Sequence, residues 1–193
     1  ISTVEDPIEY NIPGVNQTQV RPDIGVTFAN SLRTLLRQDP DIIMVGEMRD
    51  QETAEISIRA SLTGHLVLST LHTNDSPSAA TRLVDMGVEP YLVSSSITVI
   101  VAQRLVRRIC EHCKCEENVS EDIKKELGLQ PETRLYKGLG CTACGHTGYR
   151  GRTGIFEVLP ISDTIRKLIN RKAFTDEIRN QAIKEGLVTL RDN

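Results

Sequence analysis

The 193-residue chain has a net charge of −3 and ordinary shares of apolar (39%) and charged (25%) residues, as in a globular domain. Its slight acidity argues against direct nucleic-acid binding, and no apolar run approaches the roughly 18 residues of a membrane span. Four of its five cysteines form two CxxC pairs. This pattern favours a metal site in a reducing, cytoplasmic compartment over disulfides.

The first half of the chain alternates short apolar runs with amphipathic segments, which is the pattern of an α/β domain. The first residues lack the features of a signal peptide and read as a strand entered midway, so we expect a longer parent chain. Helices are expected after Thr27, after Asp50 and at Ser76-Pro77, where hydroxyl, carboxylate or proline groups favour a first helical turn. The expected strands are residues 1–4, 15–20, 42–45 and 66–71, the last two apolar enough for burial on both faces.

From residue 110 onward the composition changes, because glycine becomes frequent and the two CxxC pairs flank a charged stretch. A helix is expected at 121–127, a strand at 153–158, and terminal helices at 162–170 and 175–185. The sequence therefore predicts three parts. They are an α/β core at 1–109, a four-cysteine subdomain at 110–152, and a C-terminal strand with helices at 153–193.

Two CxxC pairs separated by a single insert predict a metal site. The cysteines are Cys110, Cys113, Cys141 and Cys144. Two such pairs complete a tetrahedral four-sulfur site for Zn²⁺, and four protein ligands leave no open position, so the zinc would be structural. Reduced thiols or two disulfides are the alternatives. Cys115 is left over, and His112 or His146 could each replace a cysteine.

A carboxylate, Glu47, ends the apolar run at 42–45. In nucleotide hydrolases, an acid at the end of a buried α/β strand lies where magnesium and the attacking water are held. Taken alone, the same pattern also fits an acid that caps the following helix.

Other groups that phosphoryl transfer requires occur in the same half of the chain: acids for a cation, arginines for phosphate and histidines to sense it. They are Glu5, Asp6, Glu9, Arg33, Arg37, Arg49, His65 and His72. Each alone is compatible with an ordinary surface ion pair, and their joint occurrence favours the phosphate interpretation. The motif GxxxxGK[ST] does not occur in these residues, so tight ATP binding by them alone is not expected.

Several longer motifs resemble those of the secretion ATPase superfamily, in its type II secretion and type IV pilus assembly branch (GspE/PilB-like). They are TVEDPIEY at 3–10, LRTLLRQDPD at 32–41, GEMRD at 46–50, GHLVLSTLHTN at 64–74 and QRLVRR at 103–108, with the four cysteines. The resemblance covers essentially the whole chain. It implies an α/β, RecA-like nucleotide-hydrolase core fragment with a four-cysteine zinc subdomain and a small C-terminal helical region.

The resemblance also implies roles for single positions. Glu47 would be the catalytic acid of an atypical Walker B motif, where it orients or deprotonates the attacking water. Other positions match the Asp box, the His box and arginines that reach phosphates within or across subunits. They are, in that order, Glu5, Asp6 and Glu9; His65 and His72; and Arg33, Arg37, Arg49 and Arg152. The four paired cysteines match the metal ligands.

For the whole protein, the resemblance implies an ATP- and Mg²⁺-dependent motor subunit, working as a cytoplasmic homo-hexamer that reaches the inner membrane through platform proteins. Neither a nucleic-acid partner nor a transmembrane segment is expected. The family's Walker A motif would precede Ile1 and its C-terminal region would pass Asn193, so these residues alone are expected to be inactive. One alternative is a DNA-uptake or pilus-retraction motor, with retraction disfavoured by the cysteines. Another is a non-enzymatic zinc adaptor that docks through Arg104, Arg107 and Arg108.

Overall fold

The computed structural model describes all residues 1–193 and divides into two compact units. Unit 1 comprises Ile1–Ala102 and Phe156–Asn193, and unit 2 comprises Gln103–Ile155. No helix in the chain combines the length and the apolar character that crossing a membrane requires.

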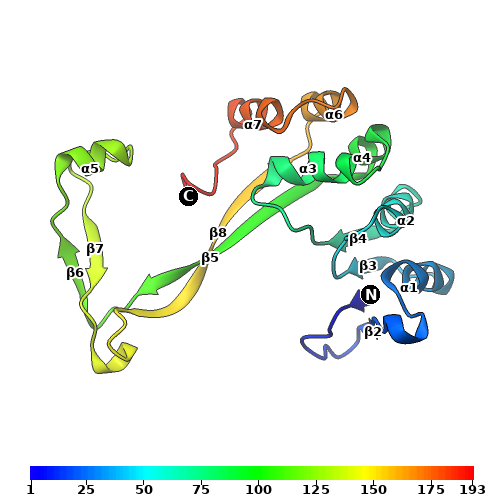
Figure 1. Ribbon diagram of the computed structural model, residues 1–193, viewed down its shortest axis with the longest axis horizontal. Coiled ribbons are helices and arrows are strands. Elements are labelled where there is room, and N and C mark those ends of the chain that lie inside the picture. Colours follow the sequence, from blue (N-terminus) through cyan, green and yellow to red (C-terminus); the bar gives the residue numbers. More distant parts are fainter. The chain divides into compact units, whose positions relative to one another are not determined.

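A four-stranded parallel sheet with the order β2-β1-β3-β4 lies in unit 1 (Figure 1). Its strands are β1 (Ser2–Glu5), β2 (Asn16–Gln19), β3 (Ile42–Val45) and β4 (Leu66–Ser69). Val4 pairs with Val45, and Val45 pairs with Ser69. The carboxyl ends of β1, β3 and β4 therefore meet at one edge of the sheet, and the expected α/β class is confirmed.

Strand β4 differs from the expectation of burial on both faces. Leu66 is 54% exposed and Leu68 is 50% exposed, whereas Ile43 and Val45 of β3 are fully buried. The reason is that Leu66 and Leu68 lie opposite Ile42 and Met44, on a face of the sheet where β3 is also only partly buried. Ile43 and Val45 belong to the other face and pack in a hydrophobic cluster with residues of α1 and α2. An apolar run predicts a strand, but it does not show whether other elements cover it.

Helices α1 and α2 lie beside the sheet (Figure 1), and two more follow β4. They are α1 (Phe28–Leu35), α2 (Gln51–Leu62), α3 (Ser76–Asp85) and α4 (Pro90–Ser96). The predicted caps are confirmed, because Thr27 Oγ1 accepts from the Asn30 N–H at 3.2 Å and Asp50 Oδ1 accepts from the Thr53 N–H at 2.8 Å. These bonds satisfy amides that lack a partner within the helix.

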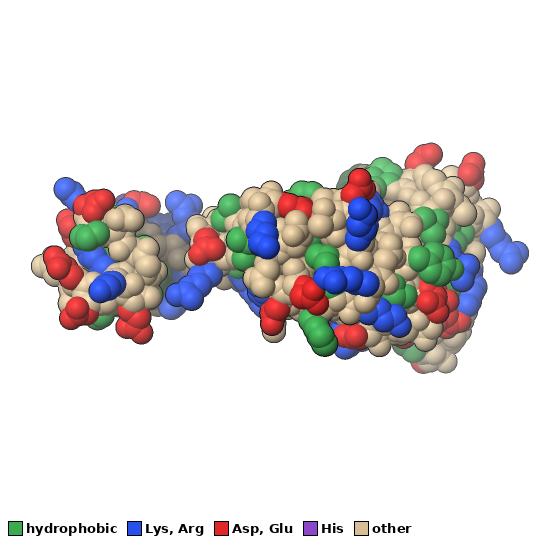
Figure 2. Space-filling view, turned by 90° about the horizontal axis from the view of Figure 1, so that it is seen from above, with side chains coloured by type: hydrophobic (Ala, Val, Ile, Leu, Met, Phe, Trp, Pro, Cys, Tyr) green, Lys and Arg blue, Asp and Glu red, His purple; other side chains and the backbone are tan.

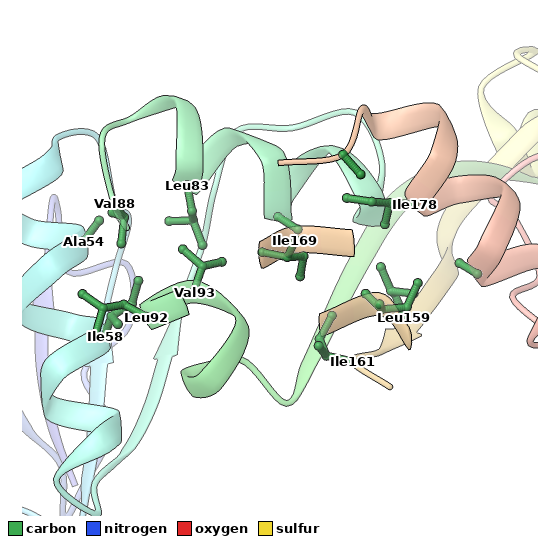
Figure 3. Packing of buried hydrophobic residues seen from close by; sticks show 14 residues of the cluster. Ala54, Ile58, Leu83, Val88, Leu92, Val93, Leu159, Ile161, Ile169 and Ile178 are labelled. Atoms are coloured by element: carbon green, nitrogen blue, oxygen red, sulfur yellow. The ribbon is translucent and has the colours of Figure 1, made fainter. Parts of the chain in front are cut away.

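The larger hydrophobic core joins α2, α3 and α4 to the C-terminal helices α6 (Asp163–Asn170) and α7 (Thr175–Lys184). Figure 3 shows Leu83 and Val93 pointing toward Ile169, with Ile178 and Leu159 further along the same core. Burying an aliphatic side chain of this size contributes about 1.5–3 kcal/mol. The C-terminal helices are therefore part of the unit that holds the parallel sheet.

Unit 2 contains an antiparallel hairpin of β6 (Lys114–Glu117) and β7 (Leu135–Gly138), with α5 (Glu121–Glu126) between its strands. Strands β5 (Val99–Ile109) and β8 (Tyr149–Pro160) pair as a separate two-stranded ribbon. Within residues 103–155, Cys110 is the one hydrophobic side chain that is buried. This unit therefore lacks an apolar core of its own.

Candidate functional site

Glu47 follows β3 at the edge where the carboxyl ends of β1, β3 and β4 meet. The Gly46 N–H donates to Val4 O at 2.8 Å. A Cβ at Gly46 would lie 3.2 Å from that oxygen and 3.4 Å from the Cα of Glu5, so a larger residue would press against β1. Glycine lets the chain leave β3 in contact with β1, and the next residue, Glu47, is only 8% exposed.

Both oxygens of the Glu47 carboxylate have a nitrogen partner. Arg49 Nη2 lies 2.5 Å from Oε1, and His72 Nε2 lies 3.0 Å from Oε2. A carboxylate offers about four lone-pair sites. Each oxygen can therefore accept one further hydrogen bond, such as one from a water molecule, without losing these partners.

The same contacts set the charge of the site. The hydrogen bond from Arg49 lowers the pKa of Glu47, burial opposes that effect, and His72 adds to the lowering. Conversely, Glu47 raises the pKa of Arg49, with a smaller contribution from the charge of Asp6. Glu47 is thus held ionised, and Asp6 lies within electrostatic reach of its partner.

His72 reaches Glu47 because the segments that leave β3 and β4 are bonded to each other. Thr70 Oγ1 donates to Gly46 O at 2.7 Å, and the Met48 N–H donates to Thr70 O at 3.1 Å. Thr70 was not among the predicted site residues. Its sequence signals are its place in the motif at 64–74 and its position near the end of a predicted strand, two residues before a predicted site histidine.

The acids after β1 lie at the same edge of the sheet. Glu5 ends β1, and its Oε1 accepts from Thr3 Oγ1 at 2.5 Å and from Gln17 Nε2 at 2.9 Å. Asp6 follows directly and is exposed, and Glu9 is exposed further along the same loop. The structure therefore brings carboxylates from the ends of β1 and β3 to one edge.

His65 and two of the arginines are not part of this cluster. His65 precedes β4 and so lies at the opposite edge, where its Nδ1 is 2.9 Å from Ala60 O. Arg33 of α1 forms an ion pair with Glu52 at 2.5 Å, and Arg37 is exposed in the turn after α1. The phosphate-related roles of these three residues stay predictions.

The four paired cysteines converge on one point of unit 2, as predicted. Their Sγ atoms all lie within 4.8 Å of one another. The distances are 3.9 Å for Cys110–Cys141, 3.9 Å for Cys113–Cys144 and 3.8 Å for Cys141–Cys144. Tetrahedral Zn–S bonds of about 2.3 Å place the sulfurs about 3.8 Å apart, whereas a disulfide needs about 2.05 Å. The thiols are free, and they fit a single tetrahedral metal ion.

Backbone amides favour a thiolate within this cluster. The N–H groups of Cys141 and Gly148 point at Cys144 Sγ at 3.2 and 3.3 Å, and the first of them is the main cause that lowers the pKa of Cys144 to about 6. Burial and the neighbouring thiols raise the pKa of Cys113 to about 12. A bound cation would hold all four deprotonated. The cluster consists of the four paired cysteines alone. Cys115, His112 and His146 lie outside it.

The remaining basic residues singled out from the sequence lie on the ribbon. Arg104, Arg107 and Arg108 belong to β5, and Arg152 belongs to β8. The Arg107 guanidinium lies 4.0 Å from the centroid of the ring of the neighbouring Tyr149. Over most of the face drawn in Figure 2, acidic and basic side chains are interspersed rather than gathered by sign. Arg152 belongs to unit 2, whereas Glu47 belongs to unit 1.

A parallel sheet that presents an ionised carboxylate at its carboxyl edge is typical of the nucleotide-hydrolase class of α/β domains. Residues 1–193 match the family described as "Type II/IV secretion system protein", and the chain belongs to this family.

The chain is similar over nearly its whole length to curated members of that family. It is 54% identical over 195 residues to the type IV pilus assembly ATPase PilB of Thermus thermophilus, covering 99% of this chain and 22% of that protein. It is 49% identical over 195 residues to the type II secretion system ATPase E of Vibrio cholerae, covering 100% and 39%. The chain thus spans between about a fifth and two fifths of the length of these relatives.

Solved structures show the same fold. The crystal structure of the pilus retraction motor PilT with bound ADP matches with a TM-score of 0.60 and 31% identity, covering 100% of this chain and 50% of that one. The ATPase DotB of Yersinia pseudotuberculosis matches with a TM-score of 0.64 and 23% identity, covering 95% and 41%. The second likeness concerns the fold alone.

Proposed function

We propose that the protein containing this chain is an ATP-hydrolysing motor subunit that powers type II secretion or type IV pilus assembly. The observation that carries this proposal is the buried, ionised Glu47, bound by Arg49 and His72 beside the acids of β1. The names of the curated relatives, and the ADP held by the related pilus retraction motor, support it.

In this proposal Glu47 is the catalytic residue. Its free lone pairs orient the attacking water and accept its proton, and Arg49 keeps the carboxylate ionised between turnovers. Glu5 and Asp6 supply oxygen atoms of the kind that Mg²⁺ prefers. MgATP, when bound, supplies the phosphoryl group and a cation that neutralises its charge.

The other matched residues are proposed to complete the site when subunits assemble. Arg37, Arg49 and Arg152 would contact phosphates, and so would Arg33 once its ion pair with Glu52 opens. His65 and His72 would respond to the nucleotide, and Glu9 would add to the acids after β1. We further propose a cytoplasmic homo-hexamer that contacts inner-membrane platform proteins. No phosphate-binding GxxxxGK[ST] loop occurs in residues 1–193, so activity belongs to the full-length protein.

The test is Glu47→Gln in the full-length protein, measured as ATPase turnover at saturating MgATP. Losing a general base lowers turnover by about 100-fold or more, while nucleotide binding should persist because the amide keeps the size of the side chain. Glu126→Gln, at an exposed position of α5, is the matched control and should retain full turnover. Wild-type turnover in Glu47→Gln would overturn the catalytic assignment. A full-length protein that binds no nucleotide would instead indicate the alternative function, a non-enzymatic zinc adaptor.

We also propose that the four-cysteine cluster binds a structural Zn²⁺. The sulfur–sulfur distances and the all-thiol donor set support this choice. Elemental analysis of the reduced protein should find one zinc per chain, and Cys141→Ser should lose it. Cys115→Ser is the matched control, because Cys115 lies outside the cluster, and it should keep the metal. Well under one zinc per chain in the wild-type protein would contradict the proposal.

A further inference from the structure

Glu157 is a buried carboxylate that neither proposed site uses. It lies on β8 and is 2% exposed. Its Oε1 accepts from both the backbone N–H of Ser76, at 2.8 Å, and the Ser76 hydroxyl, at 2.5 Å. Its Oε2 accepts from the Leu190 N–H at 3.1 Å. Burying a carboxylate is costly without such donors, so these three bonds fix both the side chain and its partners.

A short segment of the chain connects Ser76 to His72 of the Glu47 site. Ser76 is the first residue of α3, where the amides and the helix dipole favour a negative charge. His72, which contacts Glu47, lies only four residues earlier. A five-residue segment spans at most about 18 Å. The segment 72–76 is therefore held between two carboxylates, Glu47 at one end and Glu157 at the other.

The other oxygen of Glu157 ties this segment to the C-terminal part of the chain. Leu190, whose N–H it binds, lies in the residues after α7, and Asn193 Nδ2 donates to Phe156 O on the same strand at 3.0 Å. Arg179 of α7 also forms an ion pair with Asp75 at 2.9 Å. Arg179 of α7 thus contacts the turn that carries His72 directly, and the residues after α7 are linked to that turn through Glu157.

We propose that Glu157 is a positioning residue that sets the placement of His72 against Glu47, and that it links the order of residues 189–193 to that placement. The proposal rests on the proposed ATPase function only for its effect on turnover. The link itself is a property of the folded chain and is tested without nucleotide.

The first test is amide hydrogen exchange in the full-length protein without nucleotide. In Glu157→Gln, an NH₂ group replaces one acceptor oxygen, so the side chain cannot accept from both Ser76 and Leu190. One of the two backbone bonds is lost directly, and the proposed link carries the loss to the other end of the contact. We therefore expect exchange at both Leu190 and residues 72–76 to become faster by about tenfold or more. Glu89→Gln, at an exposed position of the same unit, is the matched control. Unchanged exchange at either place in Glu157→Gln would overturn the link.

The second test is a double-mutant cycle on ATPase turnover. Glu157→Gln should lower kcat by about tenfold when His72 is present, and by no further factor in a His72→Ala background, because residues that act through one contact are non-additive. KM should change little. Equal losses in both backgrounds would mean a merely structural role and would overturn the proposal, as would no loss at all.

Two further measurements separate an effect of Glu157→Gln on folding from an effect on function. Ser76→Ala removes only the hydroxyl bond and keeps the backbone one, so it should give the same pattern with a smaller loss even where Glu157→Gln lowers the unfolding temperature. If the full-length wild-type protein hydrolyses no ATP, the proposed function fails, and hydrogen exchange still decides whether Glu157 holds the His72 segment.

Discussion

At the scale of single residues, Arg49 sets the ionisation of Glu47. Its hydrogen bond is the largest cause that lowers the pKa of that carboxyl group, and burial acts in the opposite direction. In Arg49→Ala, burial is opposed by His72 alone, so the pKa of Glu47 should rise. Glu47 would then become protonated at a higher pH as the solution is acidified. The acid limb of the kcat/KM profile, which reports the free enzyme, should therefore move to higher pH.

The shift of the limb, rather than the loss of activity, is the diagnostic measurement. Arg49 lies in the site, so its removal also lowers the maximum rate, and each profile is compared after scaling to its own maximum. Arg59→Ala, an exposed arginine on α2, is the control and should leave the limb in place. A limb that stays in place or moves to lower pH in Arg49→Ala would show that Arg49 does not hold Glu47 ionised.

The residues of the site differ in how far sequence can predict them. Glu47 and His72 follow apolar runs, and the rule that parallel strands end at one edge brings them together. The same rule places His65, which precedes its strand, at the opposite edge. Glu157 gave no comparable signal, because its partners are backbone and hydroxyl donors 33 and 81 residues away along the chain.

At the scale of elements, sequence predicts best where one face of a segment is buried or a side chain caps it. Helix α1 begins after Thr27, as expected from its capping oxygen. Helix α6 begins one residue later than the expected start at 162, because Ser162 caps it from outside the helix. Strand β5 was not predicted. Residues on both of its faces are exposed, so it lacks the alternation of a half-buried strand, and its arginines read as a surface patch.

The capping of α2 gives a prediction at this scale. Asp50 bonds Thr53 twice, through the backbone N–H at 2.8 Å and the hydroxyl at 3.0 Å. Asp50→Ala leaves both donors without this partner and should destabilise unit 1 by about 1 kcal/mol, within a range of about 0.5–2. Denaturant unfolding measures the change. Asp50→Asn keeps an acceptor oxygen and should cost much less, so equal losses in both variants would contradict a capping role.

At the scale of the whole molecule, the two units have different sources of stability. Unit 1 buries three clusters of aliphatic side chains drawn from its sheet and helices. Unit 2 buries one hydrophobic side chain, that of Cys110. A unit of this size cannot offset its conformational entropy without an apolar core or a cross-link. With the proposed metal bound, the four-cysteine cluster would supply such a link between the two distant CxxC pairs.

If the cluster binds the proposed metal, its removal should therefore unfold the two units unequally. With a strong chelator, hydrogen exchange in residues 103–155 should approach the rates of an unfolded chain, because the free energy of metal binding is here the free energy of folding. Residues 1–102 and 156–193 should keep their protection, since their cores contain no metal ligand.

Added Zn²⁺ should restore the protection in Cys115→Ser but not in Cys141→Ser. Protection of 103–155 that survives complete metal removal would show that the hairpin and the ribbon are stable by themselves. Equal loss in both units would show that they fold as one.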